Sequence, residues 1–212
     1  FAPFGEGITK DRDGWGSQIP TGPSLNSPGT TIINAFEPND ERKFHTLMTA
    51  GNYYPSINPE DGGYTYPSQG ASAVNANIKK YVIGSGNNVC FMSTPQNGNV
   101  IRYADVLLTL AEAAVELDGG VSVNADAVAA FNAVRERAGL EPVTTLDREG
   151  VLKERRVEFA FEGQRWFDLL RSGRAIEIMS LHGKNPDEHH LLFPLPSAEL
   201  EINTNLTQNP GY

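Results

Sequence analysis

The most regular hydrophobic pattern lies in the second half of the chain. Between Val100 and Leu117, apolar residues recur every three or four positions, as on one buried face of an α-helix. They are Ile101, Ala104, Leu107, Leu108, Ala111, Ala114 and Val115. The run Asp118-Gly119-Gly120 predicts the end of this helix, because glycine disfavours helical backbone.

A second helix is predicted from Asn124 to Arg137. Asparagine is a favourable N-cap residue, and Gly139 occupies a position at which glycine commonly ends a helix. The apolar positions between them are Ala127, Val128, Phe131 and Val134. Because only about six residues separate the two helices, we expect them to form an antiparallel pair.

A third and longer helix is predicted after Thr145 or Asp147, either of which could cap it. Its apolar row continues beyond Gly163, so we expect one long helix that bends at this glycine. The row consists of Val151, Leu152, Phe159, Trp166, Phe167, Leu169 and Leu170.

Acidic and basic residues are interleaved with the aromatic residues of this third helix. Glu158 and Glu162 lie one helical turn apart in the predicted helix. Arg155 and Arg165 each lie three residues from one of these glutamates. We expect these charges to be partly buried and to neutralise one another.

The first half of the chain has no comparable pattern. Residues 1–99 contain 13 of the 21 glycines and 9 of the 14 prolines, so most of this half is predicted to be loop. Short strands or single helical turns are expected at Thr31–Phe36, at Glu41–Met48 with Arg42 and Lys43 exposed, and at Lys79–Ile83. Such a segment buries too little apolar surface to fold alone.

Composition and charge exclude several classes of protein. The chain has 212 residues and a net charge of −9, and this acidic balance argues against binding to the phosphate backbone of nucleic acid. It has no apolar run of about eighteen residues that could span a bilayer. A single cysteine, Cys90, excludes an internal disulfide bond. The start, Phe1-Ala2-Pro3, has neither an initiator methionine nor the layout of a signal peptide, so we expect a mature or truncated chain.

Several short motifs follow one another along the chain. The helical half contains IRYADVLL at 101–108, FNAVRERAGL at 131–140, ERR at 154–156 and DLLR at 168–171. The end of the chain contains LFPLP at 192–196 and QNPGY at 208–212, and upstream lie DERK at 40–43 and KKY at 79–81. In this order the motifs resemble the C-terminal region of the SusD/RagB family, with Leu195 where the family usually has isoleucine.

The resemblance implies a fold and a function for the whole protein. SusD/RagB proteins are surface-exposed outer-membrane lipoproteins of Bacteroidetes, built from tetratricopeptide-like helix pairs and a loop-rich part. They bind glycans, or in some cases peptides, pass them to a TonB-dependent transporter, and have no known catalysis. The usual member is more than twice this length. We therefore expect this chain to be the C-terminal portion of such a protein, attached to the membrane only through the lipidated N-terminus of the parent.

The expected fold is mainly α. A tetratricopeptide-like helix pair and a long bent helix occupy residues 100–212, and an irregular, loop-rich segment, residues 1–99, packs on them as part of one structural unit. Helix-pair repeats bury their apolar faces against neighbouring repeats. A single pair must therefore pack against the third helix and the loops, or be marginally stable.

Loop aromatics of the first half are the candidate ligand contacts. Oligosaccharide binding needs aromatic rings that stack on the apolar faces of sugars, beside groups that hydrogen-bond the hydroxyls. The candidates are Trp15, Tyr53, Tyr54, Tyr64 and Tyr66. Each could instead be an anchor that holds a loop to the core, and the family motifs do not decide between these roles.

Paired carboxylates raise the alternative of a glycosidase. Glu158 and Glu162 have the required chemistry, in which one acid protonates the leaving oxygen and the other attacks or activates water. Their arginine neighbours would keep both ionised, whereas a general acid needs a raised pKa. We therefore expect a buried ion network that joins helices, and no enzyme activity.

Metal and nucleotide sites receive little support. The cluster Asp187, Glu188, His189 and His190, with His182 nearby, does not fit the His-Glu-x-x-His zinc pattern, so we expect a solvated loop and assign no metal ligand. Asp11–Gly14 and Glu60–Gly63 contain fragments of a calcium loop without its closing glutamate, which leaves calcium open and otherwise predicts no cofactor. Glycine-rich phosphate-binding motifs are absent.

The expected function is non-catalytic binding of an oligosaccharide for nutrient capture at the outer-membrane surface, with delivery to a TonB-dependent transporter. The alternative is a helical protein-interaction module that docks a transporter or a peptide and has no sugar site of its own.

Overall fold

The computed structural model describes residues 30–57, 59–67, 76–82 and 98–212. By its contacts the chain divides into two units, one ending at Phe161 and the other formed by Glu162–Tyr212. The compositional boundary at residue 99 falls inside the first unit. Trp15, Cys90 and Asp11–Gly14 lie outside the described residues.

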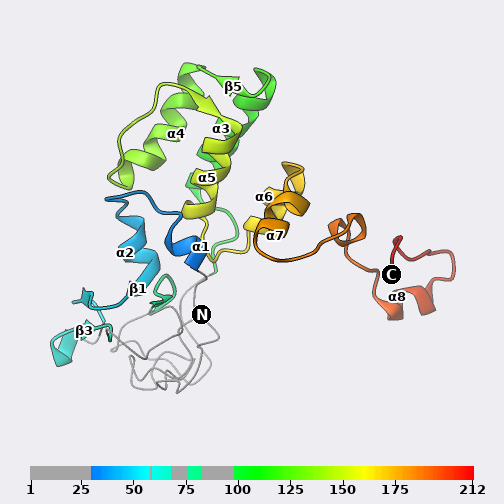
Figure 1. The fold of residues 1–212 in the computed structure, drawn as a ribbon, viewed down its shortest axis with the longest axis horizontal. Helices are drawn as coiled ribbons and strands as arrows, with labels where there is room; N and C mark the ends of the chain where they lie inside the picture. Colours follow the sequence, from blue (N-terminus) through cyan, green and yellow to red (C-terminus); the bar gives the residue numbers. More distant parts are fainter. Residues whose placement is uncertain (1–29, 58, 68–75, 83–97) are drawn as a thin grey trace. The chain divides into compact units, whose positions relative to one another are not determined.

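The predicted antiparallel helix pair is confirmed. It consists of α3 (Tyr103–Leu117) and α4 (Ala125–Arg137), and Figure 1 shows α5 (Arg148–Glu158) beside them. All three helices contribute to one hydrophobic core. Its buried residues are Ala104, Leu108, Ala111, Val115, Ala127, Phe131, Val134, Leu146, Val151 and Phe159.

The helix ends follow the predicted capping chemistry with one exception. The side chain of Asn124 accepts hydrogen bonds from the backbone of two residues in the first turn of α4, both at 3.1 Å. Asp147 caps α5 through Gly150 N at 2.7 Å. The exception is α3, because extended backbone at Arg102 (φ −121°) delays its start to Tyr103. Ile101, predicted to be buried, is therefore outside the helix and 71% exposed.

A two-residue ladder ties the turn of the helix pair to the start of α5. Strand β5 (Val121–Ser122) pairs antiparallel with β6 (Leu146–Asp147), with Ser122 opposite Leu146. Because both strands adjoin helix ends, this pairing fixes how α5 enters the core.

The predicted long bent helix is two helices. The first, α5, ends at Glu158, and α6 spans Arg165–Arg171. Between them Phe161 (φ 66°) and Gly163 (φ 81°) have left-handed backbone, which cannot continue an α-helix. Glu158 and Glu162 therefore do not lie one turn apart on a helix.

The described part of the first half contains only short elements. Helix α2 (Arg42–Thr46) leads into β1 (Leu47–Thr49), which pairs antiparallel with β4 (Ala76–Ile78). The remaining elements are α1 (Thr30–Ile33), β2 (Tyr53–Tyr54), the 3₁₀ turn η1 (Pro59–Asp61) and β3 (Tyr64–Thr65). The predictions at Thr31–Phe36 and Glu41–Met48 overlap α1, α2 and β1, whereas the third was displaced, because β4 ends just before Lys79. The elements between Tyr53 and Thr65 were not predicted.

The second unit continues with α7 (Ala175–Leu181), the 3₁₀ turn η2 (Glu188–Leu191) and α8 (Ser197–Ile202). Its end is held by side chains that bind backbone. The amide of Gln208 accepts from Leu195 N at 2.7 Å and donates to Leu195 O at 2.9 Å. Asn209 Nδ2 donates to Phe193 O at 2.7 Å. These side-chain amides therefore bind backbone groups of Leu195 and Phe193, as a neighbouring strand would do in a sheet.

Among the helices in the described ranges, none combines the length and the apolar character needed to cross a lipid bilayer.

Candidate functional site

A tyrosine-bearing hairpin in the first unit presents one ring to solvent. Strands β2 and β3 pair antiparallel, and Tyr53, opposite Thr65, is 52% exposed. Its hydroxyl donates to Gly62 O at 2.7 Å. The ring lies so close to Gly63 that a Cβ there would approach a ring carbon to 2.6 Å, and both glycines have positive φ (84° and 89°). The ring of Tyr53 is thus exposed and held in one orientation.

Two of the other tyrosine candidates lie in the core. Tyr54 and Tyr66 are both fully buried and form a small cluster with Met48 and Ile57. The hydroxyl of Tyr54 accepts from Thr49 N at 3.0 Å and donates to a main-chain carbonyl at 3.1 Å. A covered ring has no face for a sugar. Their burial is what we expect of loop anchors, the role that the sequence left as the alternative.

The cluster reaches the surface through the candidate Tyr64 and through two residues, Phe44 and Lys79, that were not predicted as ligand contacts. Half-buried Tyr64 packs against its edge. Phe44, 38% exposed, stacks on Tyr54 with ring centroids 4.8 Å apart. The ammonium group of Lys79 lies 5.4 Å from both of these stacked rings, and burial lowers its pKa. Phe44 was not predicted as a surface aromatic of this cluster, because it directly follows the charged motif DERK. An aromatic residue in a short helical turn is nevertheless a signal that could have identified it.

A second cluster, the ion network, surrounds the C-terminal end of α5. The carboxylate of Glu158 is 2% exposed and contacts three guanidinium groups. Arg137 lies 2.7 Å from it, Arg102 2.9 Å and Arg42 3.2 Å. The predicted ion network is therefore present. Its partners differ from the expected ones, because Arg155 pairs instead with Asp105 on α3 at 2.9 Å.

Arg42 extends this network to the first half of the chain. Its guanidinium donates twice to Asp40, at 2.8 and 2.9 Å, and once to Glu154 at 2.6 Å. The other oxygen of Glu154 contacts Arg135 at 3.1 Å. Arg42 was predicted to be exposed, but only 8% of its surface is accessible. Three carboxylates around one guanidinium compensate its burial, which explains the difference.

The charges keep Glu158 ionised. Burial by itself would raise the pKa of this carboxyl, but the hydrogen bond from Arg102 and the charge of Arg137 outweigh that effect and lower it. A general acid at neutral pH requires the opposite shift. The environment of Glu158 is suited to a structural anion rather than to proton donation.

The ion network extends to a more exposed ion pair, Arg135 with Glu37, whose contribution to folding stability depends on pH. The hydrogen bond from Arg135 is the main cause that lowers the pKa of Glu37 from 4.5 to about 2, and Lys153 adds to it. Because the folded pKa lies below the unfolded value, this stabilisation is present above pH 4.5 and is lost as the pH falls toward 2.

We expect Glu37→Gln to lower the urea midpoint at pH 7 and to have a smaller effect at pH 3. Glu136→Gln, at an exposed position of α4, serves as control, and an equal effect of Glu37→Gln at both pH values would contradict the linkage.

A cavity of about 230 Å³ lies beside this pair, lined among others by Glu37, Arg135, Asp147 and Lys153. It is smaller than the sites that usually enclose small molecules. Its main charged groups already pair with one another. The cavity is therefore a weaker candidate than the hairpin for contact with a ligand.

The model of the SusD family matches residues 13–212. The chain belongs to the SusD family. A SusD-like protein P2 from Formosa agariphila is 32% identical, over 89% of this chain and 40% of its own length. The chain spans less than half the length of each curated relative it matches.

Solved structures of SusD-like proteins share the fold. A laminarin-binding SusD-like protein matches with a TM-score of 0.63 and 29% identity, over 97% of this chain and 41% of that one. A crystal structure with xylogluco-oligosaccharide matches with a TM-score of 0.61 and 31% identity, over 72% of this chain and 31% of that one. The mainly helical fold expected from the resemblance is therefore confirmed.

The motifs that carry the SusD resemblance supply most residues of the ion network, and its central carboxylate, Glu158, lies just after the ERR motif. Arg42 belongs to DERK, Arg102 to IRYADVLL, and Arg135 and Arg137 to FNAVRERAGL. Glu154 begins the ERR motif. In this chain these motif residues thus join the helices to one another, whereas Tyr53 lies outside every motif.

Proposed function

We propose that this protein binds an oligosaccharide without changing it chemically, for nutrient capture at the outer-membrane surface. The main support is its similarity, over nearly the whole chain, to a laminarin-binding member of its family. The relative with xylogluco-oligosaccharide supports the same class of ligand. Because these relatives are more than twice as long, the proposal concerns the whole protein to which the chain would contribute one part of the binding surface.

The exposed ring of Tyr53 is the contact we propose for this chain. A sugar presents C–H groups on one face, and an immobilised aromatic ring binds that face with little loss of side-chain entropy. Tyr64 at the edge of the same hairpin is a second proposed contact, and Trp15 a third. The buried carboxylate of Glu158 is paired with arginines, which supports binding rather than hydrolysis.

Delivery to a TonB-dependent transporter and attachment through a lipidated N-terminus are the remaining parts of the proposal. They rest on membership of the family. The binding site would then face the exterior, and the ligand would leave by transfer to the transporter rather than by reaction.

Tyr53→Ala should weaken glycan binding about tenfold, since loss of a stacking contact of about 1.4 kcal/mol corresponds to that factor. Isothermal titration against a panel of plant, host and microbial oligosaccharides, with laminarin and xyloglucan fragments included, measures the effect. Trp15→Ala in the same panel tests the corresponding proposal for the tryptophan.

Two variants control for this substitution. Tyr53→Phe keeps the ring and removes only the hydroxyl that contacts Gly62, so its affinity should remain close to that of the original chain. Tyr103→Ala removes another exposed tyrosine, on α3, and should have no effect. A glycan that binds both Tyr53→Ala and the original chain equally would exclude Tyr53 as a contact. If no glycan of the panel binds to a chain that melts cooperatively, this result would count against a glycan site in this chain.

A row of exposed apolar side chains on α3 favours the alternative, a protein-interaction module. Tyr103, Val106, Leu110 and Leu117 are 75%, 56%, 46% and 86% exposed. Their spacing of three, four and seven residues places them on one helix face. Exposed apolar rows of this kind are typical of contact surfaces between proteins. Co-purification with the transporter, together with no response in the glycan titration, would favour this function over sugar binding.

A further inference from the structure

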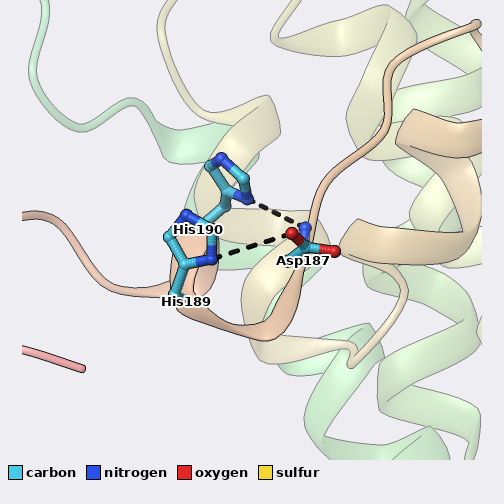
Figure 2. Close-up of side chains that lie close together, drawn as sticks. All are labelled: Asp187, His189 and His190. Atoms are coloured by element: carbon cyan, nitrogen blue, oxygen red, sulfur yellow. Dashed lines mark hydrogen bonds and ion pairs between the residues drawn. The ribbon is translucent and has the colours of Figure 1, made fainter. Parts of the chain in front are cut away.

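Three metal-ligating side chains lie together in the second unit, apart from the residues assigned above. Asp187, His189 and His190 each offer one ligand atom, and all three atoms lie within 4.8 Å of one another. Figure 2 shows the rings of both histidines turned toward Asp187. Of the five residues that the sequence suggested, His182 and Glu188 are not in this group.

The turn η2 holds the three residues in place. The backbone N–H of His190 donates to Asp187 O at 3.0 Å. In the reverse direction, the backbone N–H of Asp187 donates to Nδ1 of His190 at 2.8 Å. Nδ1 of His189 lies 3.9 Å from Oδ2 of Asp187. Because the bond from His190 N–H to Asp187 O joins backbone atoms, it can hold the turn while the side chains rotate and bring the ligand atoms closer.

The end of the chain supports His189. Gly211 has φ 94°, and a Cβ at this position would lie 2.5 Å from the Cβ of His189. The ring of Tyr212 meets that of His189 edge-on, with centroids 5.3 Å apart, and the Tyr212 hydroxyl donates to Leu192 O at 2.9 Å. The imidazole therefore has less freedom to lose when it binds a ligand.

The hydrogen bond at Nδ1 of His190 indicates which ring nitrogen can coordinate a metal ion. Its Nδ1 accepts a hydrogen bond, so that atom carries the lone pair and Nε2 carries the proton in the neutral ring. A metal ion can replace the N–H donor at Nδ1 without removing the ring proton. The single hydrogen bond lost in this exchange is a modest cost.

The ligand set selects the class of metal. Two imidazoles and one carboxylate are typical of zinc and neighbouring transition metals, whereas calcium requires six to eight oxygen atoms. Zinc–ligand bonds of about 2.1 Å place tetrahedral ligand atoms about 3.4 Å apart. The observed atoms, which lie within 4.8 Å of one another, therefore need to approach by at most about 1.4 Å, which a rotation of the exposed Asp187 and His190 side chains can supply.

We propose that Asp187, His189 and His190 bind one zinc ion, with water completing its coordination. Bound zinc would join the turn η2 to the C-terminal residues through His189. Because the carboxylate and one imidazole are exposed, the site is open to a further ligand as well as to water.

Titration of the tag-free chain with zinc chloride alone tests the site. We expect one ion per chain, and His189→Ala and His190→Ala should each weaken binding at least about tenfold because each removes one of three protein ligands. The double variant should lose the response. His182→Ala, which removes another exposed histidine of the same unit, should bind zinc as the original chain does.

NMR of the histidine ring protons provides a second measurement. The signals of His189 and His190 should shift on addition of zinc, and those of His182 should not. Circular dichroism checks that each variant is folded. Absence of binding by the original chain at millimolar zinc would overturn the proposal. So would binding that the double variant retains in full.

Discussion

Replacing Glu158 with glutamine should lower the free energy of unfolding by about 3–5 kcal/mol, the cost typical of breaking a buried ion pair from one side. The carboxylate is 2% exposed and contacts Arg42, Arg102 and Arg137. Glutamine has nearly the same shape, so the substitution removes the charge and leaves the packing almost unchanged. The three guanidinium groups would then share a site without their common anion. Urea denaturation followed by circular dichroism measures the loss.

Glu116→Gln is the matched control for this prediction. Glu116 pairs with Arg148 at 2.7 Å, but both side chains are more than half exposed. Surface pairs contribute little, because water already solvates both charges. The control should unfold close to the midpoint of the original chain. If Glu158→Gln were as mild as the control, the network would be dispensable for stability.

The helix pair could be predicted because its determinants are local. Asn124 and Gly139 act within a few residues of themselves, through a side-chain cap and a positive φ of 74°. The apolar spacing of α3 likewise needs only one turn of helix to become visible. For such elements, the residues that determine where the helix begins and ends can be recognised in a single sequence.

The break after α5 was not predicted, because it depends on one residue with no sequence signature. Gly163 marked the place, and a bend was the natural expectation. The additional left-handed residue is Phe161 (φ 66°), a conformation that non-glycine residues seldom adopt. Its backbone oxygen accepts a hydrogen bond from the hydroxyl of Tyr81 at 3.0 Å. A contact across 80 residues therefore supports a local geometry that the neighbouring sequence would not predict.

The partners in the ion network likewise depend on contacts between residues that are far apart in the sequence. Sequence spacing suggested Arg155 for Glu158, because the two are three residues apart on a predicted helix. The actual partners of Glu158 lie 21 to 116 residues away. The chemistry, a buried and neutralised carboxylate, followed from residue type. The pairing required knowledge of which helices pack together.

For the tyrosines, residue type alone could not separate contact from anchor. Tyr53 and Tyr54 are adjacent, and strand geometry directs neighbouring side chains to opposite faces. One is 52% exposed and the other is fully buried. The alternation was inherent in the sequence once a strand was assumed, but which of the two faced the core depended on Met48, Ile57 and Tyr66 packing on that side.

The family motifs and the proposed ligand contact therefore lie in different parts of this chain. Motif residues bind helices to one another, while the proposed contact Tyr53 is carried by a hairpin between DERK and KKY. The hairpin follows β1, which directly continues α2. Arg42 on α2 pairs with the carboxylates of α5. The hairpin is thus connected to the helical core through α2 and its guanidinium, beside other contacts such as those of Lys80 Nζ with the carbonyls of Glu158 and Ala160, at 3.0 and 3.2 Å.

Arg42→Ala tests that connection and should lower the free energy of unfolding by about 3–5 kcal/mol. The substitution removes the donor shared by Asp40, Glu154 and Glu158, of which Glu154 and Glu158 retain other arginines. The double variant Asp40→Ala, Arg42→Ala should be less destabilised than the sum of the two single variants, because the aspartate is no longer left unpaired. Denaturant titrations of all four chains give this coupling. Additive effects would mean that Asp40 and Arg42 contribute independently, since an independent site shows no coupling. A loss within about 0.5 kcal/mol for Arg42→Ala would mean that its guanidinium does not hold α2 on the helices.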